Sequence, residues 1–190
     1  MKQPLTLAKR RLLSAAILLG GVGIDQLTKL LAVLFLKGRP SLPLWQGVLH
    51  LTYVENQGAA FGILSEQRWV FMVFSTVAIV ALAAYLFFGK EISPLSAVAL
   101  SMIVSGGVGN MIDRLFRSAT DALGNVYYFV VDFIDFTLID FAVFNGADSF
   151  VCVGAGLMIL SLLLEMKQEM QKAKAEKAAW EEASKTEEDE

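Results

Sequence analysis

The sequence predicts an all-α integral membrane protein with four transmembrane helices, and with a β-like or interfacial loop region between the first and second of them. Two observations carry this prediction. Hydrophobic residues make up 55% of the 190 residues and the mean hydropathy is +0.56, far above the usual range of soluble domains. The chain also contains four long apolar runs, and roughly 20 apolar residues cross a bilayer as a helix. We therefore expect one membrane domain over residues 1–164.

The four runs follow one another along that domain. Residues 12–36 form the first, which follows a basic start but has no small-residue cleavage site, so we expect a retained span and no removed signal peptide. The others cover residues 69–88, 94–112 and 145–164. Beyond them, residues 165–190 mix Lys, Glu, Gln and Ala, which predicts a charged tail that is helical or disordered and carries no chemistry.

Basic residues near the ends of the runs predict the orientation. Lys9, Arg10 and Arg11 precede the first run, Lys90 lies in the short link between the second and third, and Lys167 follows the fourth. Positive charge is retained on the cytoplasmic side of membrane proteins. The sequence therefore predicts that both termini are cytoplasmic and that the two long connections lie outside.

Polar residues interrupt the apolar runs in pairs, near the predicted outer ends. An ionisable side chain within a membrane span costs several kcal/mol unless it is paired or faces water. The members of each pair are three or four residues apart, so they lie on one helix face. The two residues of the last pair can also be read as a simple helix cap. The pairs are Asp25 with Lys29, Asn110 with Arg114, and Asn145 with Asp148.

Helical rise places these pairs at a similar depth. Counting about 1.5 Å per residue, Asp25 lies about 21 Å from the basic segment before it, Asn110 about 30 Å from the lysine before its helix, and Asp148 about 28 Å from the lysine after its helix. Three independent counts thus reach the outer third of the bilayer. A polar cavity near the outer leaflet is the simplest structure that satisfies all these groups.

Carboxylates are the reactive groups that the outer segments offer. Two carboxyl groups held close together share a proton, so one serves as general base on water while the other donates a hydrogen bond to a carbonyl group. The chain has no G-x-S-x-G element, no Cys beside a His and no H-E-x-x-H zinc motif. Composition does not choose between the candidate acids, which are Asp113, Asp132, Asp135, Asp140 and Asp148.

Five short blocks then identify a resemblance that covers nearly everything from Asp25 to Ser149. On these blocks the chain resembles the bacterial lipoprotein signal peptidases, also called type II signal peptidases. The blocks, in chain order, are DQLTK at 25–29, ENQGAAFG at 55–62, GGVGNMIDR at 106–114, VVDFIDF at 130–136 and FNGADS at 144–149.

The resemblance implies a membrane aspartyl endopeptidase. Such an enzyme removes the signal peptide from diacylglyceryl-modified prolipoproteins by cleaving before the lipidated lipobox cysteine. Carried over residue by residue, the catalytic pair falls on Asp132 and Asp148, and Asp113 is not a catalytic acid. The residues expected to line the cavity or to orient substrate and catalytic pair are Asp25, Lys29, Asn56, Gly58, Asn110, Arg114 and Asn145.

The same resemblance implies the setting of the reaction. We expect a monomer in the bacterial cytoplasmic (inner) membrane, an active site near the outer leaflet, contact with membrane lipid, and inhibition by globomycin-type cyclic peptides. No metal, organic cofactor or nucleic acid is expected to take part. Residues 58–61 are expected to form an interfacial platform for the lipid, and residues 115–129, longer than in compact members, a mobile flap or an extra interfacial contact.

Two other classes of protein remain as alternatives on the residues alone. A small transporter or channel subunit would use Asp25, Lys29 and the outer acids to guide ions, and it would carry polar residues through the full membrane depth. A membrane assembly factor would not depend on any single carboxylate. The inner halves of the predicted spans are almost wholly apolar, and this favours the peptidase.

Overall fold

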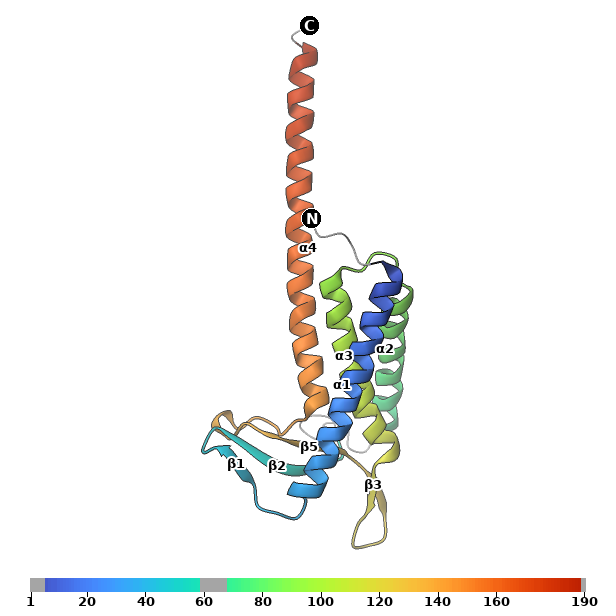
Figure 1. Ribbon diagram of the computed structural model, residues 1–190, viewed down its shortest axis with the longest axis vertical. Helices are drawn as coiled ribbons and strands as arrows, with labels where there is room; N and C mark the ends of the chain where they lie inside the picture. Colours follow the sequence, from blue (N-terminus) through green and yellow to red (C-terminus); the bar gives the residue numbers. More distant parts are fainter. Residues whose placement is uncertain (1–5, 59–67, 189–190) are drawn as a thin grey trace.

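Four long helices stand side by side in the protein, with a small β-sheet at one end of the bundle (Figure 1). The structure is a computed structural model that describes residues 6–58 and 68–188. The first helix begins and the last helix ends on the side away from the sheet (Figure 1). The helices are α1 (Leu7–Leu36), α2 (Arg68–Phe88), α3 (Pro94–Phe116) and α4 (Gly146–Glu188).

The helix surfaces match a lipid environment. By length and composition α1, α3 and the Gly146–Lys177 part of α4 can each cross a membrane, whereas the apolar part of α2, Met72–Phe88, is shorter. Large apolar side chains cover the outside of the bundle, for example Leu19, which is 70% exposed. Soluble monomers rarely expose apolar patches of this extent. The prediction of a mainly helical membrane protein is confirmed, and the count of four spans stays a prediction.

The third helix lies at the centre of the bundle and contacts α1, α2 and α4. Two of its glycines allow the closest approaches. A Cβ atom at Gly106 would overlap the backbone oxygen of Ala147, and one at Gly109 would overlap the carboxylate of Asp25. Because these positions have no side chain, α3 brings its polar end directly against α1 and the first turn of α4.

Both long connections contribute strands to one sheet. The strands are β1 (Leu42–Trp45) and β2 (Leu49–Asn56), which precede α2, and β5 (Val130–Asp135), which precedes α4. Their order is β1-β2-β5 and both pairings are antiparallel. Val54 lies opposite Asp132, and Asn56 opposite Val130. The register thereby places Asn56 two residues along β2 from the position opposite Asp132.

The stretch expected as a long flap contains a short hairpin. The strands of the hairpin are β3 (Ser118–Thr120) and β4 (Val126–Tyr128). Further along the chain, a 3-10 turn, η3 (Thr137–Ile139), follows β5. The phenol of Tyr127 donates a hydrogen bond of 2.7 Å to Glu55 of β2. The hairpin is therefore attached to the strand that ends at Asn56.

Candidate active site

Asp132 lies in the middle of β5 and is almost fully buried, with 2% of its surface exposed. Each of its carboxylate oxygens accepts a hydrogen bond from a side-chain amide. Asn56 Nδ2 donates to Oδ2 over 2.8 Å, and Asn145 Nδ2 donates to Oδ1 over 2.6 Å. One donor comes from the neighbouring strand and the other from the start of α4, so the carboxyl group joins the sheet to the bundle.

Asp148 lies in the first turn of α4, and it forms a reciprocal cap with Asn145. The backbone N–H of Asp148 donates to Asn145 Oδ1, and the backbone N–H of Asn145 donates to Asp148 Oδ2, both over 3.1 Å. This exchange is a capping box. The cap does not exhaust the two side chains, because Asp148 Oδ1 also accepts from Asn110 Nδ2 over 2.8 Å. These residues therefore cap the helix and belong to the site at the same time.

Lys29 fixes the orientation of the side-chain amides of Asn110 and Asn145. Its ammonium group can only donate, and it lies 2.9 Å from Asn110 Oδ1. Asn110 must therefore turn its NH₂ group toward Asp148. Asn110 Oδ1 also accepts from Asn145 Nδ2 over 3.0 Å, which leaves Asn145 Oδ1 facing the backbone of α4. A single buried cation thus sets which amide atoms face the two carboxylates.

The cation belongs to a buried charge network on α1 and α3. Lys29 Nζ lies 2.9 Å from Asp25 Oδ2 and 3.4 Å from Asp113 Oδ2, and these three side chains are at most 1% exposed. Arg117 Nε lies 3.3 Å from Asp113 Oδ1. Two cations therefore balance two carboxylates. Such a network is stable only while every buried charge keeps its partner.

Both acids of this network also hold backbone that carries the site. Asp25 Oδ1 accepts from the N–H of Ala147 over 2.8 Å, and Asp113 Oδ2 accepts from the N–H of Val131 over 3.1 Å. Each of these N–H groups belongs to the residue directly before a carboxylate of the site. The network therefore ties β5 and α4 to the same pair of helices.

Asp113 is one of two residues whose supporting role the sequence reasoning missed, because there it is only a candidate catalytic acid. The structure gives it a supporting place beside the carboxylate pair. Two spacings pointed to that place: Asp113 lies three residues after Asn110, on the same helix face, and four residues before Arg117, at salt-bridge distance. Gln26 was missed as well; its Nε2 atom donates to Asp25 Oδ2 over 3.1 Å.

A cavity of about 480 Å³ opens in front of Asp132 and Asp148. Arg114 lies at its wall and donates to the backbone oxygen of Asn110 over 3.4 Å. Within the described part of the chain, no group of three or more His, Cys, Asp or Glu side chains is arranged to hold a metal ion. The rest of the lining is mostly apolar and includes Val130, Phe141, Val143, Phe144 and Val153.

The environment of Asp132 favours its protonated form. The pKa of this carboxyl group is raised to about 6, chiefly by burial and also by the nearby charge of Asp148, while the hydrogen bonds from Asn56 and Asn145 act in the opposite direction. An acid in this range keeps its proton in weakly acidic solution. Asp148 is less buried and faces the cavity. The two carboxyl groups are thus held in unlike surroundings.

Gly58 contacts Asn56, which in turn contacts the Asp132 carboxylate. Its N–H donates to Asn56 Oδ1 over 3.0 Å, which turns the NH₂ group of Asn56 toward Asp132. Residues 59–67 lie outside the described residues, so the platform expected around Ala60 and Phe61 is untested. All nine predicted site residues are described: Asn56 at the end of β2 adjoins Asp132, Gly58 follows two residues later, and the others lie on α1, on α3 and at the start of α4.

Comparison with known proteins gives one consistent family. The family model for signal peptidase II matches residues 17–164. A lipoprotein signal peptidase of Brevibacillus brevis is 39% identical over 148 residues, which cover 77% of this chain and 92% of the relative. Another, from Halalkalibacterium halodurans, is 38% identical over 156 residues, covering 82% and 92%.

A solved structure agrees with these relatives. It is a bacterial membrane enzyme that superimposes with a TM-score of 0.69 at 32% identity, covering 82% of this chain and 90% of its own. The family match includes α2, α3 and both strand-forming connections, together with most of α1 and nearly the first half of α4. The chain therefore belongs to the signal peptidase II family, the lipoprotein signal peptidases, which cleave signal peptides from prolipoproteins.

Proposed function

We propose that this chain is an aspartyl endopeptidase in which Asp132 and Asp148 act together on a water molecule. One observation carries the proposal: the Asn145 side chain bonds Asp132 while its backbone and amide oxygen bond Asp148, so one residue holds both carboxylates. Both face one cavity with apolar walls. This arrangement suits carboxyl chemistry, because paired acids in unlike surroundings can divide the roles of acid and base.

The difference in burial assigns those roles. Asp132, whose pKa is raised to about 6, chiefly by burial, holds the proton and donates a hydrogen bond to the scissile carbonyl oxygen. Asp148, which is more open to the cavity, takes a proton from water as the water oxygen attacks the carbonyl carbon. When the C–N bond breaks, the proton on Asp148 passes to the leaving nitrogen, and one proton remains on the pair.

Asn145 supports the carboxylates and has no donor left for the oxyanion. Its two amide protons are used by Asp132 and by Asn110. Of the two roles that chemistry allows it, fixing a carboxylate is therefore favoured over binding the tetrahedral intermediate. Arg114, at the cavity wall, is the cationic side chain there and is suited to a substrate backbone carbonyl.

The position of the site supports a lipidated substrate. Asp148 lies in the first turn of α4, and α4 begins at the end of the bundle that carries the sheet, so the cavity is near one membrane surface (Figure 1). There the signal helix can stay in the bilayer while a diacylglyceryl chain keeps the cysteine among the headgroups. We propose that this surface is the outer surface of the bacterial inner membrane. We also propose that the enzyme is monomeric, with four membrane spans and cytoplasmic termini.

A cleavage assay tests the proposed function. The purified full-length protein is incubated with a diacylglyceryl-modified prolipoprotein, and release of the signal peptide is followed on a gel. Cleavage before the modified cysteine is expected, together with inhibition by globomycin. The same precursor without the diacylglyceryl group is the control, and it should be cut far more slowly. Absence of cleavage of the lipidated precursor would refute the proposal.

The pH dependence of kcat/KM should shift when Asn56 is replaced by Ala. In the wild type, kcat/KM should fall as the pH rises through about 6, because Asp132 then loses the proton it needs. The Asn56 hydrogen bond stabilises the ionised carboxylate, so its loss raises the pKa of Asp132. The alkaline limb of the profile should therefore move to higher pH.

A neighbouring substitution on the same pair of strands is the control. Thr52→Ala removes a hydrogen bond of 2.7 Å to Asp135, which lies three residues after Asp132. It should leave the pH profile where it is in the wild type. If the alkaline limb of the kcat/KM profile of Asn56→Ala moved to lower pH, the assignment of the proton to Asp132 would be contradicted.

A further inference from the structure

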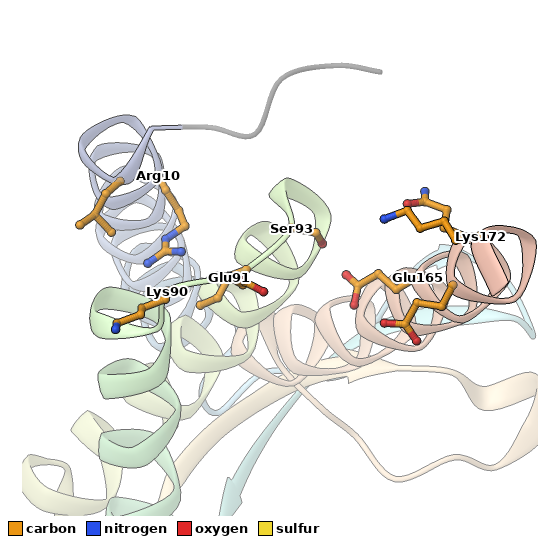
Figure 2. A pocket seen from close by; sticks show the side chains of 10 residues that line it. Arg10, Lys90, Glu91, Ser93, Glu165 and Lys172 are labelled. Carbon is orange, nitrogen blue, oxygen red and sulfur yellow. The ribbon is translucent and has the colours of Figure 1, made fainter. Parts of the chain in front are cut away.

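A second cavity lies at the opposite end of the bundle from Asp132, with a volume of about 560 Å³ (Figure 2). Three parts of the chain form it: the first turns of α1, the link between α2 and α3, and the turns of α4 that follow its apolar stretch. Its walls carry an unusual number of charges. The charged side chains that line it are Arg10, Lys90, Glu91, Glu165, Glu169 and Lys172.

Arg10 has a buried donor that nothing in the described chain uses. The side chain is only 3% exposed, and Nη2 donates to the backbone oxygen of Gly89. Its Nε atom is buried and has no hydrogen-bond partner among the described residues. A buried donor of a charged group is unfavourable when it stays unpaired, because it has lost its hydrogen bonds to water. Figure 2 shows the guanidinium group extending from α1 toward the link.

The charges around the cavity do not pair with one another. No two of the six form an ion pair within 4.0 Å among the described residues. Figure 2 shows why: Arg10 and Lys90 lie on one side, and Glu165 and Lys172 across the cavity on α4. With Glu91, the first side has a net charge of +1. With Glu169, the α4 side has a net charge of −1.

Each side also has a feature that prepares it for a charged ligand. Ser93 caps the N-terminus of α3 at the cavity wall, where the helix dipole favours an anion. On the other side, Glu165 Oε1 accepts hydrogen bonds from Ser161 over 3.1 Å and from Ser96 over 3.3 Å. Both serines are buried, so they hold the Glu165 carboxylate in one place.

We propose that this cavity binds the headgroup of a phospholipid that carries a primary amine, such as an ethanolamine phospholipid. The phosphodiester lies against Arg10 and Lys90, and its oxygen accepts the unused Nε proton. The ammonium group lies against Glu165 and Glu169. A zwitterion suits the cavity because its charges are separated, as the charges of the two walls are. A primary ammonium suits Glu165 because it donates hydrogen bonds, which a quaternary ammonium cannot do.

The surroundings favour a lipid over a soluble ligand with the same headgroup chemistry. The cavity is at the level where apolar helix surface begins, because large apolar side chains are exposed within one turn of the lining residues, for example Leu12 after Arg10 on α1 and Leu162 before Glu165 on α4. Acyl chains can cover this surface while the headgroup occupies the cavity. Bound there, the lipid would connect α4 to the start of α1.

Thermal unfolding of the purified full-length protein in detergent tests the site, with no need for catalytic activity. Short-chain phosphatidylethanolamine should raise the Tm progressively with its concentration, by about 3–6 °C at ten times its Kd. Phosphatidylcholine and phosphatidylglycerol with the same chains should do much less. Equal shifts with all three lipids would overturn the proposal. If soluble phosphoethanolamine raised the Tm as much as the lipid does, the claim that the natural ligand is a lipid would be overturned. Inorganic phosphate should leave the Tm unchanged.

A matched pair of variants tests the phosphate contact. Arg10→Gln should weaken phosphatidylethanolamine binding at least tenfold. Arg11→Gln removes the same charge one residue away, from an exposed side chain that does not line the cavity. Like Arg10, Arg11 donates a hydrogen bond to a backbone oxygen, which lies at the end of α2 and 2.9 Å away. It should bind as the wild type does. Equal affinities in the two variants would overturn the proposal, and Lys90→Gln replaces Arg10→Gln if the latter does not fold.

A second pair tests the amine contact. Glu165→Gln should remove the preference for phosphatidylethanolamine over phosphatidylcholine while keeping part of the phosphate affinity. Glu176→Gln makes the same change on an exposed part of α4 beyond the cavity, and the preference should persist. Loss of the preference in both variants, or in neither, would contradict the assignment.

Discussion

Asp148→Asn is expected to lower kcat/KM for prolipoprotein cleavage by about 10²–10⁴-fold, the range that general acid–base groups contribute. The substitution keeps the size of the side chain and the helix cap, because the Asn oxygen still accepts from Asn145. It removes the base that takes the proton from water. Asp132→Asn should cost as much, since the amide has no acidic proton to give to the scissile carbonyl.

The control for this prediction lies on the same strand as Asp132. Asp135→Asn makes the same chemical change three residues along β5, at a carboxylate that accepts from Thr52 and does not line the cavity. It should retain nearly full activity. The gel assay on lipidated substrate measures all three variants, and Tm values confirm that each is folded. Full activity of Asp132→Asn or Asp148→Asn in a folded protein would refute the catalytic pair.

Lys29→Met is expected to destabilise the protein by about 3–5 kcal/mol and to abolish activity. Two buried carboxylates, on Asp25 and Asp113, lose the cation that lies between them. Asn110 loses the donor that fixes its amide, so its NH₂ group is no longer held toward Asp148. A large fall in Tm and loss of cleavage at temperatures below the new Tm are the measurements.

Lys37→Met is the matched control, because it shows that burial and not distance decides the effect. In the wild type, the ammonium group of Lys37 lies 2.7 Å from Glu55, a shorter distance than those in the ion pairs of Lys29, but the Lys37 side chain is 50% exposed. Exposed ion pairs contribute about 0–1 kcal/mol. A fall in Tm as large as that of Lys29→Met would contradict this account.

A triple substitution separates the two effects of Lys29. Replacing Asp25 and Asp113 by Asn together with Lys29→Met removes both unpaired carboxylates. Arg117 loses its acid, but its side chain is 25% exposed and can be solvated, so much of the lost stability should return. Activity should not return, because Asn110 still lacks its orienting donor. Recovery of full cleavage in the triple variant would show that the cation acts only on stability.

The polar positions on the helices were predictable because helix geometry is local. A rise of about 1.5 Å per residue was enough to place Asp25, Asn110 and Asp148 at one depth, and the structure joins all three in one hydrogen-bond network. The spacing of Asn145 and Asp148 also allowed a helix cap, which is present. Spacing did not indicate that the cap and the site use the same atoms.

The sheet was less accessible to sequence reasoning, because strand pairing is a non-local property. β2 and β5 are separated by two helices in the chain, and their register alone brings Asn56 to Asp132. No periodicity within either connection encodes that register. For the same reason the choice of Asp132 over Asp135 came from family resemblance, and the backbone contact of Asp113 with Val131 could not be foreseen.

The buried tie between Asp113 and Val131, and its counterpart between Asp25 and Ala147, have a consequence for biosynthesis. The groups around the two carboxylates come from α1, β2, α3, β5 and α4, and α4 begins only at residue 146 of the 190, so it is synthesised last. A partly inserted chain has neither the second carboxylate nor the contacts that hold the first. On the proposed mechanism, the nascent protein therefore has no catalytic pair during its own insertion, and hydrolysis of neighbouring polypeptides is expected only after the fold is complete.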